Sequence, residues 1–460
     1  MVQMLGMAVV ASAMFTSCAD EPDKYEATDG VPVVKYIRCL STEVKGNNDA
    51  EDMHYTNGEL VTSASPGNTL CLIGENLRSV HEVYFNNLPT NPNPSYITDN
   101  TLIISVPGKV PTVVTDKIYL ITAAQDTVTV DFHVSVPAPQ VSRMECEYAE
   151  AGDVQRISGN YFIDDPGTPL AVYFTGAGDQ MIPAKILAKD PEFTFIDIEV
   201  PAGAEPGPVY VESVYGKSKS AFQYKDQRGM LFDFDTPNPV TNTVLGNHGW
   251  HPRDIISDQY SLVGNYVQLG DGATDLEGAG ENWSWLDGQF SFEYWAGGSW
   301  SGVEDYGDAP RLIDVANFAD WQNMTLKFEI FVPSSNPWSC CAMQIIPAAT
   351  TEITGGGAAV DIYGSPVPGA NNTFFNGTQL PRYLYRPWTA TGSFDTGDKW
   401  ITVSIPLTSF IYDENGETAK LSLSKESFSS FTFFVWKGGV DGTPCKPIIK
   451  MDNIRVVPNK

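Results

Sequence analysis

Positive charge is scarce in this chain of 460 residues. It has 28 Lys and Arg residues against 56 Asp and Glu residues, a formal net charge of −28 at pH 7. A protein of this charge repels a phosphate backbone, which argues against nucleic acid as a partner. The sequence also lacks an apolar run of the ~20 residues that a membrane-spanning helix needs, so we expect no transmembrane helix in the mature chain.

Tryptophan is absent from the first 249 residues. All ten tryptophans lie between Trp250 and Trp436. Aromatic rings supply flat apolar surface, and a β-domain of this size needs only some of them for its core. The remainder predict a site for a flat, weakly polar ligand such as a sugar ring, in a C-terminal domain carried on a plainer scaffold.

Cysteine and histidine are too few and too scattered for a metal centre. The cysteines show no C-x-x-C spacing, which argues against a zinc site and against a dense disulfide framework. Neighbouring Cys340 and Cys341 would point to opposite faces of a strand. The sequence leaves open whether either pairs with Cys445. The one close histidine pair, His248 and His251, has no third ligand nearby in the sequence.

An apolar stretch typical of an export signal lies at the N-terminus. Residues 5–15 have the sequence LGMAVVASAMF and are followed by Thr, Ser and Cys18. This junction resembles the lipobox of bacterial lipoproteins, with Phe15 in place of the usual Leu. The resemblance implies a signal peptide over residues 1–17 and lipid attachment at Cys18. The alternative is an apolar strand or helix that ends at a chance Cys. A signal peptide usually has Lys or Arg before its apolar run, and their lack here favours a start codon further upstream.

An acidic, turn-prone stretch follows Cys18. Its sequence is ADEPDKYE, and we expect a tether over residues 18–30. It resembles the acidic stretch that sends some Bacteroidetes lipoproteins to the cell surface. The resemblance implies a lipid-anchored protein on the outer face of the outer membrane.

An internal repeat organises the first half of the chain. Gly67-x6-Gly74-Glu-Asn-Leu is followed by a Val-Tyr-Phe strand and a Val-Pro pair, and the same order recurs from Gly152-x6-Gly159. Counterparts lie about 85 to 94 residues apart, the size of a small immunoglobulin-like sandwich. The order resembles the TIG/IPT family of immunoglobulin-like domains. We expect one such domain over residues 31–136 and a second over residues 139–224, both acting as spacers.

The third domain is expected over residues 229–460. Its strand candidates alternate or are apolar throughout, and its loops are rich in Gly, Asn and Asp: residues 266–269, 289–295, 325–332, 342–346, 359–363, 400–406 and 430–436. This pattern predicts a jelly-roll-like β-sandwich without a helix of normal length. The whole chain is therefore expected to be all-β, with two tandem immunoglobulin-like sandwiches before this domain.

The opening F-D-F-D, a W-I-T-V-S-I-P-L strand and a closing D-N-I-R-V resemble carbohydrate-binding modules of the β-sandwich fold. With the lipobox and the two repeats, the architecture resembles the surface glycan-binding lipoproteins that Bacteroidetes encode beside their glycan importers. The resemblance implies a protein without enzymatic activity that captures a polysaccharide, xyloglucan first and mixed-linkage glucan or mannan next. It also implies an importer complex as a partner.

Six tryptophans lie among Gly, Asn, Pro and Ser, where an exposed ring costs solvation unless a ligand covers it. They are the predicted sugar platform: Trp283, Trp285, Trp295, Trp300, Trp338 and Trp388. Trp321, Trp400 and Trp436 adjoin apolar strands and are expected in the core or at its rim.

Planar side chains suit the paired hydroxyls of sugars. Arg382 and Arg386 are therefore predicted to clamp a sugar near Trp388, although each could instead pair with a surface carboxylate. Tyr363 is a weaker addition to this binding set.

Two other functions are weighed against glycan binding. A glycoside hydrolase needs a pair of carboxyl groups across the scissile bond, and Glu293 with Glu304 and Asp305 is the nearest candidate. The E-x-D-x-x-E strand motif of jelly-roll glucanases is absent, so we expect no enzyme. An adhesin or assembly subunit would use Trp and Tyr at its interface equally well.

A cofactor is not expected, with one structural exception left open. Many β-sandwich carbohydrate modules hold Ca²⁺ between their first and last strands. The resemblance implies that Asp233, Asp235 and Asp452 could supply oxygen ligands for such an ion. Paired Asp residues at strand ends are also common as turn residues.

Overall fold

The computed structural model describes residues 30–40, 58–236, 255–277, 290–294, 310–348 and 380–459. The chain divides into two compact units. Unit 1 comprises Met1–Ala138 with Ile163–Leu170 and Ser213–Gly216, and unit 2 comprises Pro139–Phe162, Ala171–Glu212 and Lys217–Lys460. No described helix exceeds four residues, and none could span a membrane. The predicted all-β fold class is confirmed.

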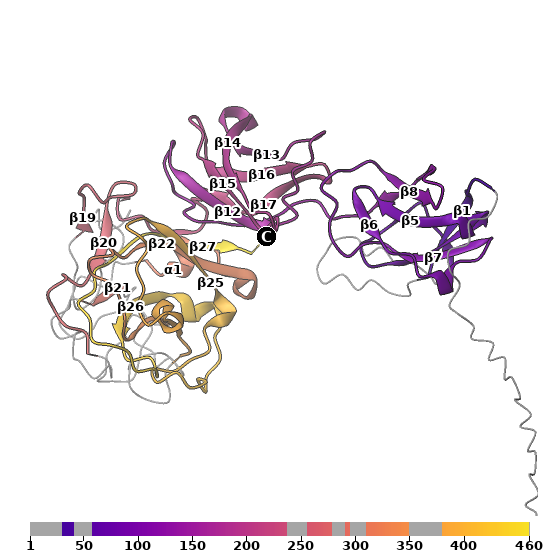
Figure 1. Ribbon diagram of the computed structural model, residues 1–460. Helices are drawn as coiled ribbons and strands as arrows, with labels where there is room; N and C mark the ends of the chain where they lie inside the picture. Colours follow the sequence, from indigo (N-terminus) through magenta and orange to yellow (C-terminus); the bar gives the residue numbers. More distant parts are fainter. Residues whose placement is uncertain are drawn as a thin grey trace, which may run out of the picture. The chain divides into compact units, whose positions relative to one another are not determined.

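The first immunoglobulin-like domain forms most of unit 1, and its sheets lie in the indigo to purple part of Figure 1. Two four-stranded antiparallel sheets have the orders β2-β1-β4-β7 and β6-β5-β8-β9, and β3 and β10 form a short parallel pair. The strands are β1 (Val33–Cys39), β2 (Glu59–Leu60), β3 (Ser63–Ala64), β4 (Thr69–Glu75), β5 (Val80–Phe85), β6 (Leu88–Thr90), β7 (Thr101–Ser105), β8 (Lys117–Thr122), β9 (Thr127–Asp131) and β10 (His133–Val134). Two 3₁₀ turns, η1 (Leu77–Ser79) and η2 (Pro94–Tyr96), connect them.

The repeated glycines have a structural cause. A Cβ atom on Gly74 would lie 1.8 Å from the Val33 carbonyl oxygen, and one on Gly159 would lie 1.8 Å from the Gln140 carbonyl oxygen. In each repeat the neighbouring strand is bulged at this point, which brings its backbone too close for any side chain. The repeated glycines therefore mark the same close approach of two strands in both domains.

The second immunoglobulin-like domain has a seven-stranded antiparallel arrangement of order β11-β12-β15-β14-β13-β16-β17 (Figure 1). The long strand β14 belongs to both halves of this arrangement, because Met181–Ala184 pair with β13 and Lys185–Lys189 pair with β15, with a bulge between Ile186 and Ala188. The elements are β11 (Gln140–Met144), β12 (Val154–Asn160), β13 (Ala171–Thr175), η3 (Ala177–Asp179), β14 (Met181–Lys189), β15 (Phe195–Glu199), β16 (Gly207–Ser213) and β17 (Gly216–Tyr224).

The C-terminal domain is a sandwich of two antiparallel sheets. One has the order β19-β20-β27-β22-β25 with β18 also paired to β27, and the other has the order β21-β26-β23-β24. The strands are β18 (Met230–Phe232), β19 (Ile255–Ile256), β20 (Tyr266–Leu269), β21 (Ser291–Tyr294), β22 (Met324–Phe331), β23 (Ala342–Ala348), β24 (Tyr383–Tyr385), β25 (Ile401–Pro406), β26 (Ser430–Trp436) and β27 (Ile449–Pro458). Short helical turns join them: α1 (Leu312–Val315), η5 (Trp321–Asn323), η6 (Pro387–Ala390), η7 (Leu407–Ser409) and η8 (Lys425–Phe428).

Six of the seven predicted strands of this domain are confirmed within about two residues at each end, and residues 359–363 lie outside the described residues. The predicted first and last segments pair, since β18 runs antiparallel to β27. The core between the sheets is aromatic. Phe232 packs against Phe292 with ring centroids 5.3 Å apart, and Phe328 packs against Phe433 at 6.1 Å.

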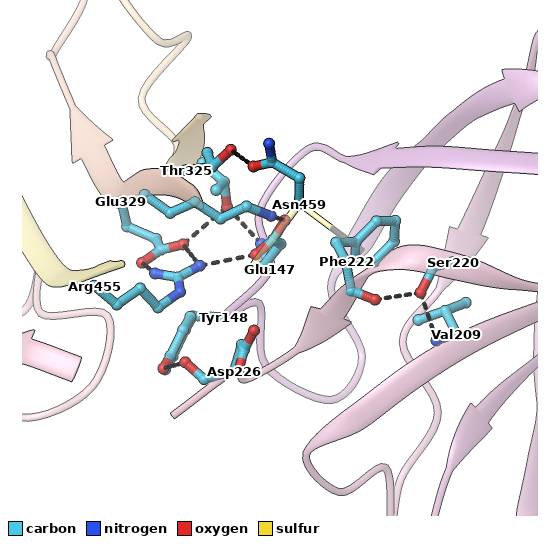
Figure 2. Close-up of polar contacts among 12 residues, drawn as sticks. Glu147, Tyr148, Val209, Ser220, Phe222, Asp226, Thr325, Glu329, Arg455 and Asn459 are labelled. Atoms are coloured by element: carbon cyan, nitrogen blue, oxygen red, sulfur yellow. Dashed lines mark hydrogen bonds and ion pairs between the residues drawn. The ribbon is translucent and has the colours of Figure 1, made fainter. Parts of the chain in front are cut away.

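A buried ionic network joins the second immunoglobulin-like domain to the C-terminal sandwich within unit 2 (Figure 2). Arg455 on β27 donates to Glu329 on β22 at 2.8 and 3.1 Å and to Glu147, in the turn after β11, at 2.8 Å. Lys327 donates to the other oxygen of Glu147 at 2.5 Å, and Thr402 donates to Glu329 at 2.8 Å. Two carboxylates and two cations thus balance in a buried site.

Residues 225–228 (KDQR) form a charged link between these two domains, and hydrogen bonds hold it in place. The backbone N–H of Lys225 donates to the Glu147 carbonyl at 2.8 Å, and the hydroxyl of Tyr148 donates to the Asp226 carbonyl at 2.6 Å. The guanidinium of Arg228 donates to both oxygens of the buried Asp226 carboxylate. The link is therefore bonded to the second immunoglobulin-like domain through Lys225 and Asp226, and Arg228 is bonded to Asp226.

Candidate functional site

A surface hollow of about 420 Å³ lies on the C-terminal sandwich beside Trp321. Its volume falls within the range of small-ligand pockets, and most of its lining is apolar. We call it the Trp321 hollow, and it is lined by Trp321, Pro381, Thr408, Phe410, Ile411, Thr418, Ala419, Leu421, Ser422 and Leu423.

Core packing fixes the aromatic wall of the Trp321 hollow. Trp321 is half-buried and begins η5, and its ring contacts the buried ring of Phe428 at 5.6 Å between centroids. Phe428 in turn stacks on Phe318 at 5.3 Å and meets Phe410 at 6.2 Å. The exposed part of the Trp321 indole is therefore held rigidly, which limits the entropy lost when a ligand stacks on it.

The chemistry of the hollow suits a sugar ring. The Trp321 indole presents apolar ring surface, and the exposed Ile411 extends this surface outward, while Phe410 is buried beneath it. Hydroxyl groups of Thr408, Thr418 and Ser422 can donate to or accept from sugar hydroxyls. No charged side chain lines it, so recognition there would depend little on salt.

Four of the six platform tryptophans and one further residue of the predicted binding set lie outside the described residues. These are Trp283, Trp285, Trp295, Trp300 and Tyr363, and the lipidation residue Cys18 lies outside them as well. Their roles stay predictions from the sequence.

The structure corrects the prediction for Trp338 and Trp388. Trp338 is fully buried and Trp388 is 4% exposed, so neither ring can stack on a sugar. The indole N–H of Trp338 donates to the Cys340 carbonyl at 2.6 Å, and that of Trp388 donates to the Cys341 carbonyl at 2.7 Å. Their Pro-rich surroundings resemble those of an exposed loop, but both segments close over the core and satisfy the polar atom of the ring.

The predicted arginine clamp is wrong for Arg382. Its side chain is fully buried and donates to Gln344 at 2.5 Å, while Nε and Nη2 have no partner. Burial lowers the pKa of Arg382 to about 10, although the nearby carboxylates of Glu414 and Asp413 act to raise it. Arg386 is half-buried and donates to the Gly438 carbonyl at 2.5 Å, so its clamp role stays a prediction.

Trp321 lies at the rim of the core, as the sequence predicted, but it was not among the predicted platform residues. The ring was expected at the core or its rim because it precedes the apolar strand β22, and it does pack on the core along one edge. The signal in the sequence is weak: Asp320 and Gln322 flank the ring with polar residues, which is more typical of a partly exposed position.

The three aspartates proposed for Ca²⁺ do not fit an ion site. Among the described residues, no group of three His, Cys, Asp or Glu side chains could hold a metal ion. The Asp233 carboxylate accepts from the backbone N–H groups of Asp235 and Thr236, and the Asp235 carboxylate accepts from Asn265. Both aspartates therefore act as turn residues here.

Asp452 differs from the other two because it is buried on β27. One carboxyl oxygen accepts from the Asn453 N–H at 2.7 Å, and the other has no partner. Burial, together with the nearby carboxylates of Glu329, Asp235 and Asp233, raises the pKa of Asp452 to about 9. The group is therefore protonated at neutral pH in the folded protein.

This protonation predicts a pH dependence of stability. The unfolded chain releases the Asp452 proton near its ordinary pKa of 3.8 and the folded chain near 9, so stability falls as pH rises between these values. Asp452→Asn keeps the acceptor and removes the ionisation. We expect the variant to exceed the parent by roughly 1–3 kcal/mol in unfolding free energy at pH 8, with a smaller difference at pH 5. Urea unfolding at both values measures this, and a variant less stable than the parent at pH 8 would contradict it.

Glu293 was the first of the carboxyl groups considered for catalysis, and it lies on β21. Its side chain is buried, and its carboxylate accepts from the hydroxyl of Ser291 at 3.2 Å. A catalytic carboxyl must reach a bound substrate. Glu293 is not among the residues that line the Trp321 hollow.

The architecture is that of a modular β-sandwich binding protein. Immunoglobulin-like sandwiches come first, and a larger sandwich with a rigid, half-buried tryptophan at its surface hollow follows them. A family model described as "Surface glycan-binding protein B xyloglucan binding domain" matches residues 224–458. The crystal structure of surface glycan-binding protein PbSGBP-B from Prevotella bryantii is 43% identical, with a TM-score of 0.80, over 95% of this chain and 100% of that chain. This chain belongs to the surface glycan-binding protein B family, and the predicted resemblance to the surface glycan-binding proteins of Bacteroidetes is confirmed.

A further relative has an IPT/TIG name. An IPT/TIG domain-containing protein from Bacteroides ovatus is 24% identical over 168 residues. The match covers 35% of this chain and 30% of that protein, so the chain spans under a third of its length. The predicted IPT/TIG and immunoglobulin-like character is confirmed.

Proposed function

We propose that this protein captures a soluble plant β-glycan at the cell surface, with xyloglucan as the preferred ligand. The observation that carries the proposal is the match of the whole C-terminal sandwich to a family of xyloglucan-binding domains. The Trp321 hollow supports it, because it offers a rigid ring, apolar surface and hydroxyl groups without charge. Trp283, Trp285, Trp295, Trp300 and Tyr363 are also proposed to bind the glycan.

The rest of the chain serves to present this domain. We propose that Cys18 carries the lipid anchor in the outer membrane and that the immunoglobulin-like domains act as spacers. The ionic network of Glu147, Glu329 and Arg455 supports a stiff joint before the binding domain. A glycan-uptake system is the proposed recipient of the captured polysaccharide.

We propose that this protein binds its polysaccharide and does not cleave it. The family that it matches is described by binding, and the described Glu293 is buried in the sandwich. Incubation with xyloglucan, followed by a reducing-sugar assay, tests this point. Release of new reducing ends would contradict it.

Trp321→Ala is expected to weaken xyloglucan binding by roughly tenfold. The loss follows from removing one stacked ring, which contributes ~1 kcal/mol beyond its buried area. Native affinity gels cast with xyloglucan, mixed-linkage glucan, galactomannan and starch show the preference, and calorimetry with oligosaccharides of increasing length gives the dissociation constants.

Tyr260→Ala is the matched control. Tyr260 is an exposed aromatic residue of the same domain, 47% accessible, and it does not line the hollow. The control should bind as the parent does. If Trp321→Ala also binds as the parent does, the hollow is not the site, and single Ala variants of Trp283, Trp285, Trp295 and Trp300 then locate it.

The same measurements separate glycan capture from protein adhesion. Polysaccharide binding predicts affinity that rises with oligosaccharide length and changes little with salt. No retardation in any of the four gels would contradict the proposal and favour an adhesin or assembly subunit.

A further inference from the structure

Two cysteines distant in sequence meet at one end of the C-terminal sandwich. Cys340 lies just before β23, and Cys445 lies before β27, 105 residues later. Their sulfur atoms are 3.6 Å apart, and Cys340 is fully buried while Cys445 is partly exposed. Two sulfurs at this distance are in van der Waals contact, with no atom between them.

The backbone holds the two segments together independently of the thiols. Ser339 and Thr443 are joined by two hydrogen bonds of 2.9 Å, one of them from the Ser339 hydroxyl. Cys445 exchanges backbone hydrogen bonds of 2.8 and 3.1 Å with Leu276. A Cβ atom on Gly442 would lie 2.3 Å from the Ser339 carbonyl oxygen, so the segments approach as closely as a glycine allows.

We propose that Cys340 and Cys445 form a disulfide bond in the exported protein. The sulfurs need to approach by about 1.5 Å to reach the ~2.05 Å of an S–S bond, a movement within reach of side-chain rotation. Surface proteins of bacteria pass through an oxidising envelope, where such bonds form and persist. The inference needs export and does not depend on which glycan is bound.

Cys341 is the competing thiol, and a bond between it and the adjacent Cys340 would be strained. Adjacent Cα atoms are ~3.8 Å apart, below the ~4.4–6.8 Å that disulfides span. The Cys341 thiol instead contacts the Glu277 carbonyl oxygen at 3.5 Å.

The chemistry needs an oxidant, and a disulfide of an envelope thiol–disulfide oxidoreductase or oxidised glutathione supplies it. The Cys445 thiolate attacks one sulfur of the oxidant and releases a thiolate. The Cys340 thiolate then attacks the Cys445 sulfur of the mixed disulfide and releases the second oxidant sulfur. Two protons and two electrons leave the protein, and the oxidant is reduced to two thiols.

The timing of this reaction follows from the surroundings of the thiols. Hydrogen bonding with Cys341 and burial raise the pKa of Cys340 to about 12, and hydrogen bonding with Cys340 raises that of Cys445. The thiolate is the nucleophile, so oxidation of the folded protein is slow. The bond therefore forms while the chain folds in the envelope.

The test uses the full chain expressed in a bacterium that exports it. Free thiols are blocked with N-ethylmaleimide under denaturing conditions, and unreduced peptides are analysed by mass spectrometry. We expect a cross-linked pair that contains Cys340 and Cys445, retained in Cys341→Ser and lost in Cys445→Ser. Full N-ethylmaleimide labelling of both residues in the exported parent, or a cross-link through Cys341, would overturn the proposal.

Stability supplies a second readout. Closing a loop of this length restricts the unfolded chain, so reduction of the exported parent should lower Tm by on the order of 10 °C. Cys445→Ser should show no change in Tm upon reduction, which separates loss of the bond from other effects of the reductant. An unchanged Tm of the parent upon reduction would contradict the proposed stabilising bond.

Discussion

Replacement of Arg455 with Met is expected to lower the unfolding free energy of unit 2 by about 3–5 kcal/mol. The substitution removes the guanidinium that contacts Glu329 and Glu147, and both carboxylates stay buried with only Lys327 and Thr402 as partners. Burial already raises the pKa of Glu329 in spite of Arg455. Without that cation the protein must protonate a carboxyl group or open the site to water.

Scanning calorimetry measures this effect and its consequence for the joint. The parent is expected to unfold its second immunoglobulin-like domain and its C-terminal sandwich together, whereas Arg455→Met separates the two transitions. Arg311→Met is the matched control, because Arg311 pairs with Asp314 at the surface, with 41% and 54% of the side chains exposed. The control should cost under about 1 kcal/mol. Equal losses in the two variants would contradict the role of the buried network.

Trp338→Ala is expected to destabilise the C-terminal sandwich by about 3–5 kcal/mol without altering the glycan site itself. The fully buried ring packs against Tyr385 with centroids 5.9 Å apart, and its removal leaves a cavity. It also removes the N–H donor to the Cys340 carbonyl. Thermal unfolding should show the loss, and Trp338→Phe should recover part of it because it restores most of the apolar volume.

Binding by the same variant distinguishes a core role from a ligand contact. Affinity gels run well below the unfolding midpoint of Trp338→Ala should show the retardation of the parent, because the folded molecules keep the site. A variant with the midpoint of the parent and no retardation would show that the ring contacts sugar, against its burial here.

Local patterns were enough to predict most of the strands. Alternation buries Val172 and Phe174 of β13 and leaves the other residues of this strand at intermediate exposure. The repeated Gly74 and Gly159 mark equivalent bulges, and the spacing between them predicts the two immunoglobulin-like domains. These features depend on residues close together in the sequence, and a strand has the same period wherever it lies in the fold.

Exposure of single aromatic residues was not predictable in the same way. Trp338 and Trp388 follow prolines in segments rich in polar residues, yet both rings are buried, whereas Trp321 beside an apolar strand keeps an exposed edge. Composition describes the neighbours of a residue along the chain. Burial depends on which distant segments fold over it.

The sequence by itself determined the all-β class, the repeat, the strands and the family resemblance, because each of these depends on local periodicity or on motif order. Only the tertiary structure decided that Glu147 meets Arg455 across 308 residues and that Cys340 meets Cys445 across 105. It also placed Trp321 at a hollow and Arg382 in the core. Such contacts between distant residues follow from the pairing and packing of whole sheets, which no local pattern specifies.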